Sequence, residues 1–247
     1  MAKFSSKDCI LLIDGYNVMG VNTELTHTKE AGTEESTAFG DTWQAHLAVG
    51  INRAETTQEG FYDDAAASIN AALNEQQGVA RIMSAGFEGN TMGKAFVGHA
   101  GNLQINYNRI ASVNSLHRVN ASYLSSGVVD EGLLLLPLTV LTADGNTAST
   151  PVDGGAATDY GGAAYLHVTN VEDCDDIVVK VRDSADGLAF ADLLTFTAVA
   201  PTRGAERLTV AAGVGSVRRY LAASWAFTNP GAAPSATVLV GFARYTS

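Results

Sequence analysis

From residue 79 to residue 244 the sequence is a succession of short apolar segments, most of them closed by glycine, asparagine or aspartate. Valine, isoleucine, threonine and aromatic residues favour strands, whereas the turn residues allow tight reversals of the chain. The chain holds 25 glycines and only 5 prolines, which suits many strands joined by short turns. The pattern predicts a mainly β fold, with strands near 79–87, 94–97, 103–107, 116–124, 133–142, 163–168, 177–181, 194–199, 206–211, 219–227 and 237–244.

Residues 142–162 divide these strands into two groups and are rich in glycine and small polar residues. Such composition is typical of a domain boundary or of a long hairpin. We place a boundary near residue 150, with one β domain over 1–150 and a second over 151–247. The six strands expected in the second domain fit a β-sandwich of about 90 residues. The leucine run at 133–136 predicts a strand buried on both faces or paired at an interface, and Pro137 limits the ladder beyond it.

One segment has the period of a helix rather than of a strand. Asp63 or Asp64 supplies an N-cap, and Gly78 is a natural C-terminal stop. The apolar residues between them recur on one face: Ala66, Ile69, Ala72 and Leu73. The spacing predicts a single amphipathic helix near 63–76, flanking a sheet or barrel.

The first forty residues combine a hairpin signal with a long segment that has no apolar period. Asp14-Gly15 predicts a turn between two short strands over 8–19. Residues 20–40 are rich in threonine and glutamate and read as a long loop. Compact domains rarely keep such a loop without a function. Its end, Glu34 to Trp43, is acidic and carries two aromatic residues, which either fold back onto the core or contact a partner.

The charge of the chain argues against condensation on nucleic acid. The net charge is −11, and residues 1–80 hold 12 acidic but only 4 basic side chains. Affinity for phosphate comes from lysine and arginine, so an acidic surface repels DNA. Ordinary acidic solubility explains the same charge. The arginines at 203, 207, 218 and 219 form a small basic cluster that salt bridges to acidic neighbours would explain.

No arrangement of residues in the sequence indicates catalysis, a cofactor or a metal. The five histidines have no metal-ligand spacing, and Cys9 and Cys174 form no motif. The acidic run 172–176 lacks the alternating ligands of a calcium loop and reads as a hairpin turn. His99 and His117 could pair with Asp130, but nothing in the sequence demands it. We expect a structural protein that is not an enzyme, with no cofactor, no metal and no membrane segment, made as a soluble intracellular product.

Several segments resemble the major tail tube proteins of long-tailed bacteriophages. The front segment Thr37-Ala38-Phe39-Gly40-Asp41-Thr42-Trp43 is followed by Gly60-Phe61-Tyr62-Asp63. The stretches 183–196 and 219–244 are similar to the same class. These segments lie in both halves of the chain. The resemblance implies a tail-tube-type β-sandwich or barrel with one flanking helix, plus a C-terminal β-sandwich.

The resemblance also implies a function in assembly. Family members form hexameric rings that stack into a tube, through which genomic DNA passes without specific binding, and other tail proteins meet the tube ends. The protein would then belong to the tail of a virion assembled in the host cytoplasm. A long loop, here about 27–42, reaches a neighbouring subunit or ring, and its expected contact residues are Glu34, Glu35, Thr37, Phe39, Asp41 and Trp43. The alternative is a virion-surface decoration or a carbohydrate-binding sandwich, with Tyr160, Tyr165, Phe190 or Trp225 as a sugar platform.

Overall fold

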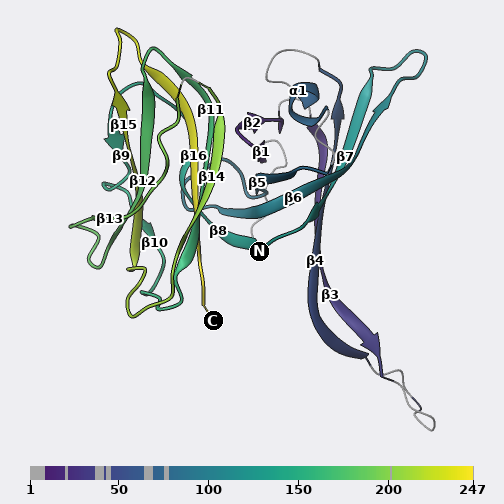
Figure 1. Ribbon diagram of the computed structural model, residues 1–247, viewed down its shortest axis with the longest axis horizontal. Helices are drawn as coiled ribbons and strands as arrows, with labels where there is room; N and C mark the ends of the chain where they lie inside the picture. The colour runs from purple at the N-terminus through teal and green to yellow at the C-terminus, as the bar shows by residue number, and fades with distance from the viewer. Residues whose placement is uncertain are drawn as a thin grey trace.

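The computed structural model describes residues 9–19, 22–36, 42, 46–63, 69–74, 78–200 and 202–246. Its strands form two antiparallel sheets, one of 11 strands and one of 5, so the prediction of a mainly β fold is confirmed. Figure 1 shows a sandwich at one side and a long hairpin that projects from the other. The elements are β1 (Ile10–Ile13), β2 (Tyr16–Asn17), β3 (Asn22–Glu35), β4 (His46–Phe61), α1 (Ile69–Leu73), β5 (Ala80–Gly86), β6 (Ala95–Ile110), β7 (Arg118–Ser125), β8 (Val129–Leu141), β9 (Gly145–Asn146), β10 (Val152–Asp153), β11 (Gly162–Glu172), β12 (Asp176–Ser184), β13 (Ala191–Thr195), β14 (Gly204–Val210), β15 (Tyr220–Thr228) and β16 (Ser235–Arg244).

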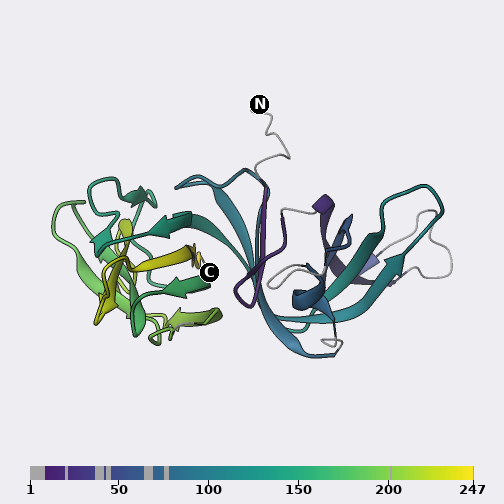
Figure 2. The same cartoon turned by 90° about the horizontal axis from the view of Figure 1, so that it is seen from above.

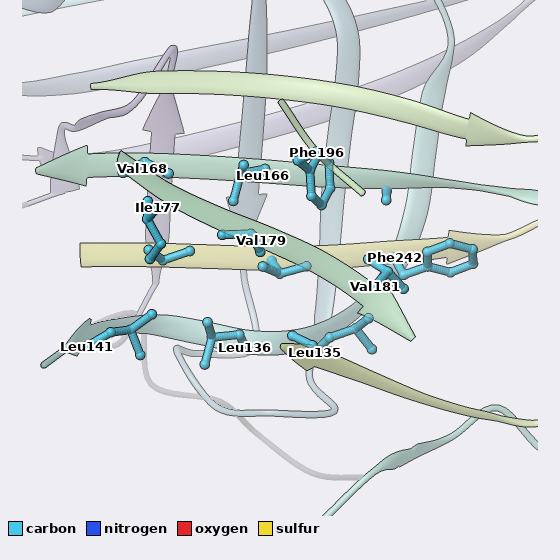
Figure 3. Packing of buried hydrophobic residues seen from close by; sticks show 14 of the residues in the cluster. Leu135, Leu136, Leu141, Leu166, Val168, Ile177, Val179, Val181, Phe196 and Phe242 are labelled. Atoms are coloured by element: carbon cyan, nitrogen blue, oxygen red, sulfur yellow. The ribbon is translucent and has the colours of Figure 1, made fainter. Parts of the chain in front are cut away.

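The sandwich is formed by strands β8, β11, β14 and β16 of the large sheet and by the small sheet. Strand β12 buries every second residue, as a strand with one face against a core must. Its buried residues pack against side chains of β8, β11 and β16 (Figure 3). The residues labelled there are Leu135, Leu136, Leu141, Leu166, Val168, Ile177, Val179, Val181, Phe196 and Phe242.

The predicted boundary near residue 150 falls between β9 and β10 and stays a prediction. Strand β8 precedes it, yet β8 pairs with β16 and gives three leucines to the sandwich core. Pro137 lies where this ladder shifts register, since Leu136 faces Val240 whereas Thr139 faces Val238. A proline cannot donate to a ladder, and a bulge accommodates it. The pairing of β8 with β16 nevertheless continues past Pro137 to Leu141↔Ala236, so the proline shifts the register of this ladder and does not end it.

Strand β6 joins the sandwich to the rest of the chain. The first part of one edge, residues 95–99, pairs with β8, and the rest of that edge, residues 102–110, pairs with β7. The opposite edge pairs with β5. Strands β7 and β8 therefore follow each other along β6 and then separate, β7 toward β4 and β8 toward β16.

Strand β1 is buried on both faces. Leu11 and Ile13 pack against α1, β5 and β7, whereas Ile10 and Leu12 pack against β6, β8 and β11. The turn after β1 contacts β11, a strand of the large sheet that belongs to the sandwich. The Gly15 N–H donates to His167 Nδ1 of β11 at 3.4 Å. Gly15 has φ of 80°, and a Cβ there would lie 2.5 Å from the Val168 carbonyl oxygen. The Asp14-Gly15 turn, predicted from the sequence, therefore also needs glycine for a close approach.

Helix α1 is shorter in the described residues than the predicted 63–76. It spans Ile69–Leu73, while residues 62 and 63 are not helical, and 64–68 and 75–77 lie outside the described residues. The predicted apolar face is confirmed for Ile69, Ala72 and Leu73, which are all buried. The predictions for Asp64 and Ala66 concern residues outside the described ones. Gly78 takes φ of 77°, the left-handed conformation expected at a helix stop.

Residues 22–35 form a strand, so the prediction of a loop over 20–40 is wrong for them. Strand β3 pairs with β4 from Asn22↔Gly60 to Glu35↔His46. Much of β3 is exposed on both faces. A strand without a buried face has no apolar alternation, and this is why its sequence reads as a loop. Figure 1 shows this long hairpin, β3 and β4, extending away from both cores.

We predict that Leu135→Ala lowers the free energy of unfolding by about 3 kcal/mol, because it leaves a cavity in a closed core. Leu135 is 0% exposed. The matched control is Leu188→Ala, at a residue that is 86% exposed, and we expect a change within about 0.5 kcal/mol. Urea denaturation of both variants measures the difference, and equal effects would contradict the assigned packing.

Candidate functional site

The candidate site is the long hairpin with the surface at its root. Strand β7 supports only one end of it, since β7 pairs with residues 55–61 of β4. Beyond that point β3 and β4 pair with each other alone among the described residues. We call residues 30–35 and 46–53 the outer half of the hairpin. Figure 2 shows, from above, that the hairpin and the sandwich lie on opposite sides of β6.

The predicted contact residues fall at the far end of this outer half. Glu34 faces Leu47 and Glu35 faces His46 across the ladder, and Glu35 is exposed. Thr37, Phe39, Asp41 and Trp43 lie outside the described residues. The structure thus places the two glutamates at the end of a strand, where the sequence predicted a loop.

Strand β3 has one edge without a partner among the described residues. It pairs with β4 only, along 14 residues. An edge strand presents backbone N–H and C=O groups that can pair with another chain. A two-stranded ribbon is also marginally stable by itself in water. The outer half of the hairpin is therefore a surface suited to contact with another molecule.

An ion pair fixes the root of the hairpin to the sandwich side of the molecule. Lys29 Nζ of β3 donates to Glu131 Oε1 of β8 at 2.5 Å, and this hydrogen bond is the main cause of a lowered Glu131 pKa. Beside it lies a groove of about 470 Å³ between the hairpin and the β7–β8 turn. Its walls include Arg53, Ser125 and Val128. Charged, polar and apolar residues line this groove, and its lining residues do not form a catalytic arrangement.

A polar chain lies behind that ion pair. His27 Nδ1 is 3.0 Å from Thr56 Oγ1, which is 3.5 Å from His99 Nε2. The two imidazole rings meet edge to face, with centroids 5.2 Å apart. Burial lowers the pKa of His27 and lowers that of His99 to about 3. Both rings are therefore neutral in the folded protein at neutral pH.

Sequence analysis missed both of these root contacts. Lys29 and Glu131 are 102 residues apart, and Thr56 and His99 are 43 apart. No local pattern in the sequence marks these contacts, because the hairpin is brought to β6 and β8 only by the pairing of β3 with β4 and of β4 with β7. A lone histidine in an apolar or threonine-rich strand gives no signal of its partner.

The Asp130 carboxylate accepts hydrogen bonds from groups other than His99 and His117, the two histidines considered from the sequence. Tyr165 OH donates to Asp130 Oδ2 at 2.5 Å, and Arg207 Nε donates to the same oxygen at 3.0 Å. Burial and the bond to Asp130 raise the Tyr165 pKa, so this phenol stays a neutral donor. His99 bonds Thr56 instead, and His117 lies against the Tyr62 ring. The pairing of either histidine with Asp130 is not formed.

Ion pairs account for most of the basic cluster near the C-terminus, as the sequence indicated. Arg207 pairs with Asp130, Arg219 with Asp153 and Arg218 with Asp183. The Arg203 guanidinium lies 4.2 Å from the centre of the Tyr16 ring.

The residues considered for a sugar platform do not form one surface. Tyr165 is fully buried, whereas Tyr160 is exposed. The Trp225 indole Nε1 donates to the Ala143 carbonyl. In the part of the chain that the structure describes, no group of three histidine, cysteine or acidic side chains is placed to hold a metal. No helix there is long and apolar enough to cross a membrane.

Removing the Arg207 guanidinium should destabilise the fold because it leaves the Asp130 carboxylate buried without its cation. We predict that Arg207→Leu lowers the free energy of unfolding by about 3–5 kcal/mol. The matched control is the double variant Asp130→Asn/Arg207→Leu, which buries no charge and should be less destabilised. Urea denaturation of the three proteins measures this, and a double variant as unstable as the single one would contradict the assignment.

The buried histidines predict a loss of stability in acid. Burial lowers the pKa of His99 and of His167 to about 3 from 6.5. Below pH 6.5 the unfolded chain therefore binds more protons than the folded one, and the free energy of unfolding falls as the pH is lowered toward 3. His99→Gln should make this dependence shallower than in the unsubstituted protein. Denaturant titrations of both proteins across this pH range provide the measurement, and identical slopes would refute the prediction.

No family model and no curated protein matches the sequence. The solved structures whose folds are similar to that of this chain include the following three. The virion of a native gene transfer agent particle is 15% identical with a TM-score of 0.43, over 52% of this chain and 98% of that chain. The tail of an empty gene transfer agent particle with C6 symmetry is 15% identical with a TM-score of 0.40, over 52% and 97%. The Dit protein (gp 19.1) of SPP1, a hub adsorption apparatus of phages infecting Gram-positive hosts, is 11% identical with a TM-score of 0.33, over 96% and 99%.

Proposed function

We propose that the chain is a structural subunit of a phage-type tail, and that the long hairpin joins one copy to another. The observation that carries this proposal is a two-stranded ribbon that projects from both cores and has one edge of β3 with which no described strand pairs. A folded chain keeps such an edge at the risk of aggregation unless a partner covers it. The partner here is a second copy, and the role is assembly, not catalysis.

The projection suits a repeated contact between copies that stack in one direction. A surface at one end of a subunit that meets a different surface of the next copy generates an open-ended assembly. Hexameric rings stacked in this manner would form a tube. Other tail proteins would meet the ends of that tube, in the tail of a virion assembled in the host cytoplasm.

The charge of the chain suits a channel for DNA. Each copy carries a net charge of −11, so a ring of copies is strongly acidic. An acidic bore does not hold phosphate, and genomic DNA would pass through it without specific binding. Contacts between the copies must offset the repulsion between them.

The direct test is a shortened hairpin. Ala31 faces Asn52 across the ladder, so residues 32–51 can be replaced by Asn-Gly, which closes a two-residue hairpin turn. The contacts of Lys29, His27 and Thr56 at the root remain. We expect a folded protein whose unfolding transition is close to that of the full chain but which forms no rings or tubes.

Electron microscopy and sedimentation velocity at high protein concentration provide the measurement, alongside circular dichroism as the control for folding. Assembly of the full chain, and its loss in the folded short variant, supports the proposal. Tubes formed equally well by the short variant would show that another surface joins the copies. A full chain that stays monomeric at all concentrations and in particles would reject the tail-subunit function.

A further inference from the structure

The connection between β6 and β7 is a second projection, and it is apolar at its surface. We call residues 105–118 the β6–β7 tip. Val113 is 90% exposed and Leu116 is 70% exposed, and Ile105 and Ile110 are each about half exposed. The other large exposed apolar residues are spread over different strands and connections: Val79, Val128, Val140, Tyr160, Leu188 and Val214. Single exposed apolar residues are ordinary, but a group at one projection indicates a contact surface.

The tip also lies in a long stretch without acidic residues in this acidic chain. The sequence contains no aspartate or glutamate from residue 89 to residue 129, and the same holds for residues 207–247 in the sandwich. The tip itself carries Arg109, His117 and Arg118, and the Arg118 guanidinium lies over the Phe61 ring. The outer half of the long hairpin has the opposite net charge, with Glu30, Glu34 and Glu35 on β3 against one arginine, Arg53, on β4. The two projections are complementary in charge.

The strand register places these projections at opposite ends of the molecule. Strand β4 starts at His46, opposite Glu35, and ends at Phe61, opposite Arg118 at the start of β7. The 16 residues of β4 therefore separate the two ends, a span of about 50 Å for an extended strand. In Figure 1 the β6–β7 tip points up and the long hairpin points down. The tip of one copy cannot reach the outer half of its own hairpin.

We propose that the β6–β7 tip is the surface on which the acidic outer half of the long hairpin of a second copy docks. This inference rests on the proposed function and names its partner surface. The arginines would face the glutamates, while Val113 and Leu116 would be covered by the docked hairpin. The contact is head to tail, because each copy carries one of the two surfaces at each end. Complementary charge would fix the direction and the register of the contact.

The test is a charge swap at two exposed residues. Arg118→Glu places an acid opposite Glu35, and like charges at an interface oppose binding. We expect the concentration needed for assembly to rise by about tenfold or more. Glu35→Arg alone should have a similar effect, and the double variant Glu35→Arg/Arg118→Glu should restore assembly. Val113→Asp/Leu116→Asp should abolish it, whereas Leu188→Asp, at an exposed residue of the sandwich, should not.

Cross-linking gives a readout independent of affinity. In assembled protein, Glu35→Cys combined with Leu116→Cys should give disulfide-linked chains, and Glu35→Cys combined with Leu188→Cys should not. The inference is overturned if tip variants assemble normally while the shortened hairpin does not, and this result leaves the proposed function standing. If the full chain and all variants remain monomeric, the proposed function fails, and the inference fails with it.

Discussion

The rest of the structure depends on the backbone ladder of strand β6. One edge of this strand carries β8 and then β7, and the other edge carries β5. Because β7 and β8 follow each other along that edge and then diverge, the chain separates into two bodies that share one sheet. The sandwich grows from β8, and the long hairpin grows from β7 through β4. Loss of the β6 ladder would leave both without a common support.

Side chains hold these two bodies in different ways. The sandwich is held to the rest of the sheet by apolar packing. One face of β1, which carries Ile10 and Leu12, packs against Phe96, Leu134, Tyr165 and Leu239. The root of the hairpin is held by polar groups, among them Thr56, Gln58 and His99, which are all buried. Burial of apolar area stabilises strongly and without direction, whereas polar groups contribute only where their geometry is met. The hairpin is therefore fixed in direction at its root and free of the core along its outer half.

The arrangement of charge along the chain acquires a direction only in this fold. The acidic residues of β3 and the acid-free stretch 89–129 are sequence features with no spatial meaning by themselves. Antiparallel pairing of β4 with β7 sends them to opposite ends. An assembly that grows in one direction needs two complementary surfaces at opposite ends, and this pairing supplies them.

The elements that sequence analysis predicted well are those whose signals are local. The Asp14-Gly15 turn, the strand near 177–181 and the apolar face of α1 each depend on residues a few positions apart. Strand β3 was missed because it has no buried face, and so lacks the apolar period by which a strand is recognised. The contacts Lys29–Glu131 and Thr56–His99 were missed because their partners come from distant strands. Glu34 and Glu35 were predicted as contact residues, but their place at the end of a long ribbon was not predicted.

The sequence by itself determined the mainly β class, the core-facing residues of its regular strands and the acidity of its first third, because strand propensity, apolar period and charge are properties of neighbouring residues. Only the tertiary structure decided that β6 supports two diverging bodies and that one edge of β3 has no partner among the described strands. It alone also decided that an acidic projection and an apolar, basic one point in opposite directions. These features depend on strand register, which is set by hydrogen bonds between segments far apart in the chain.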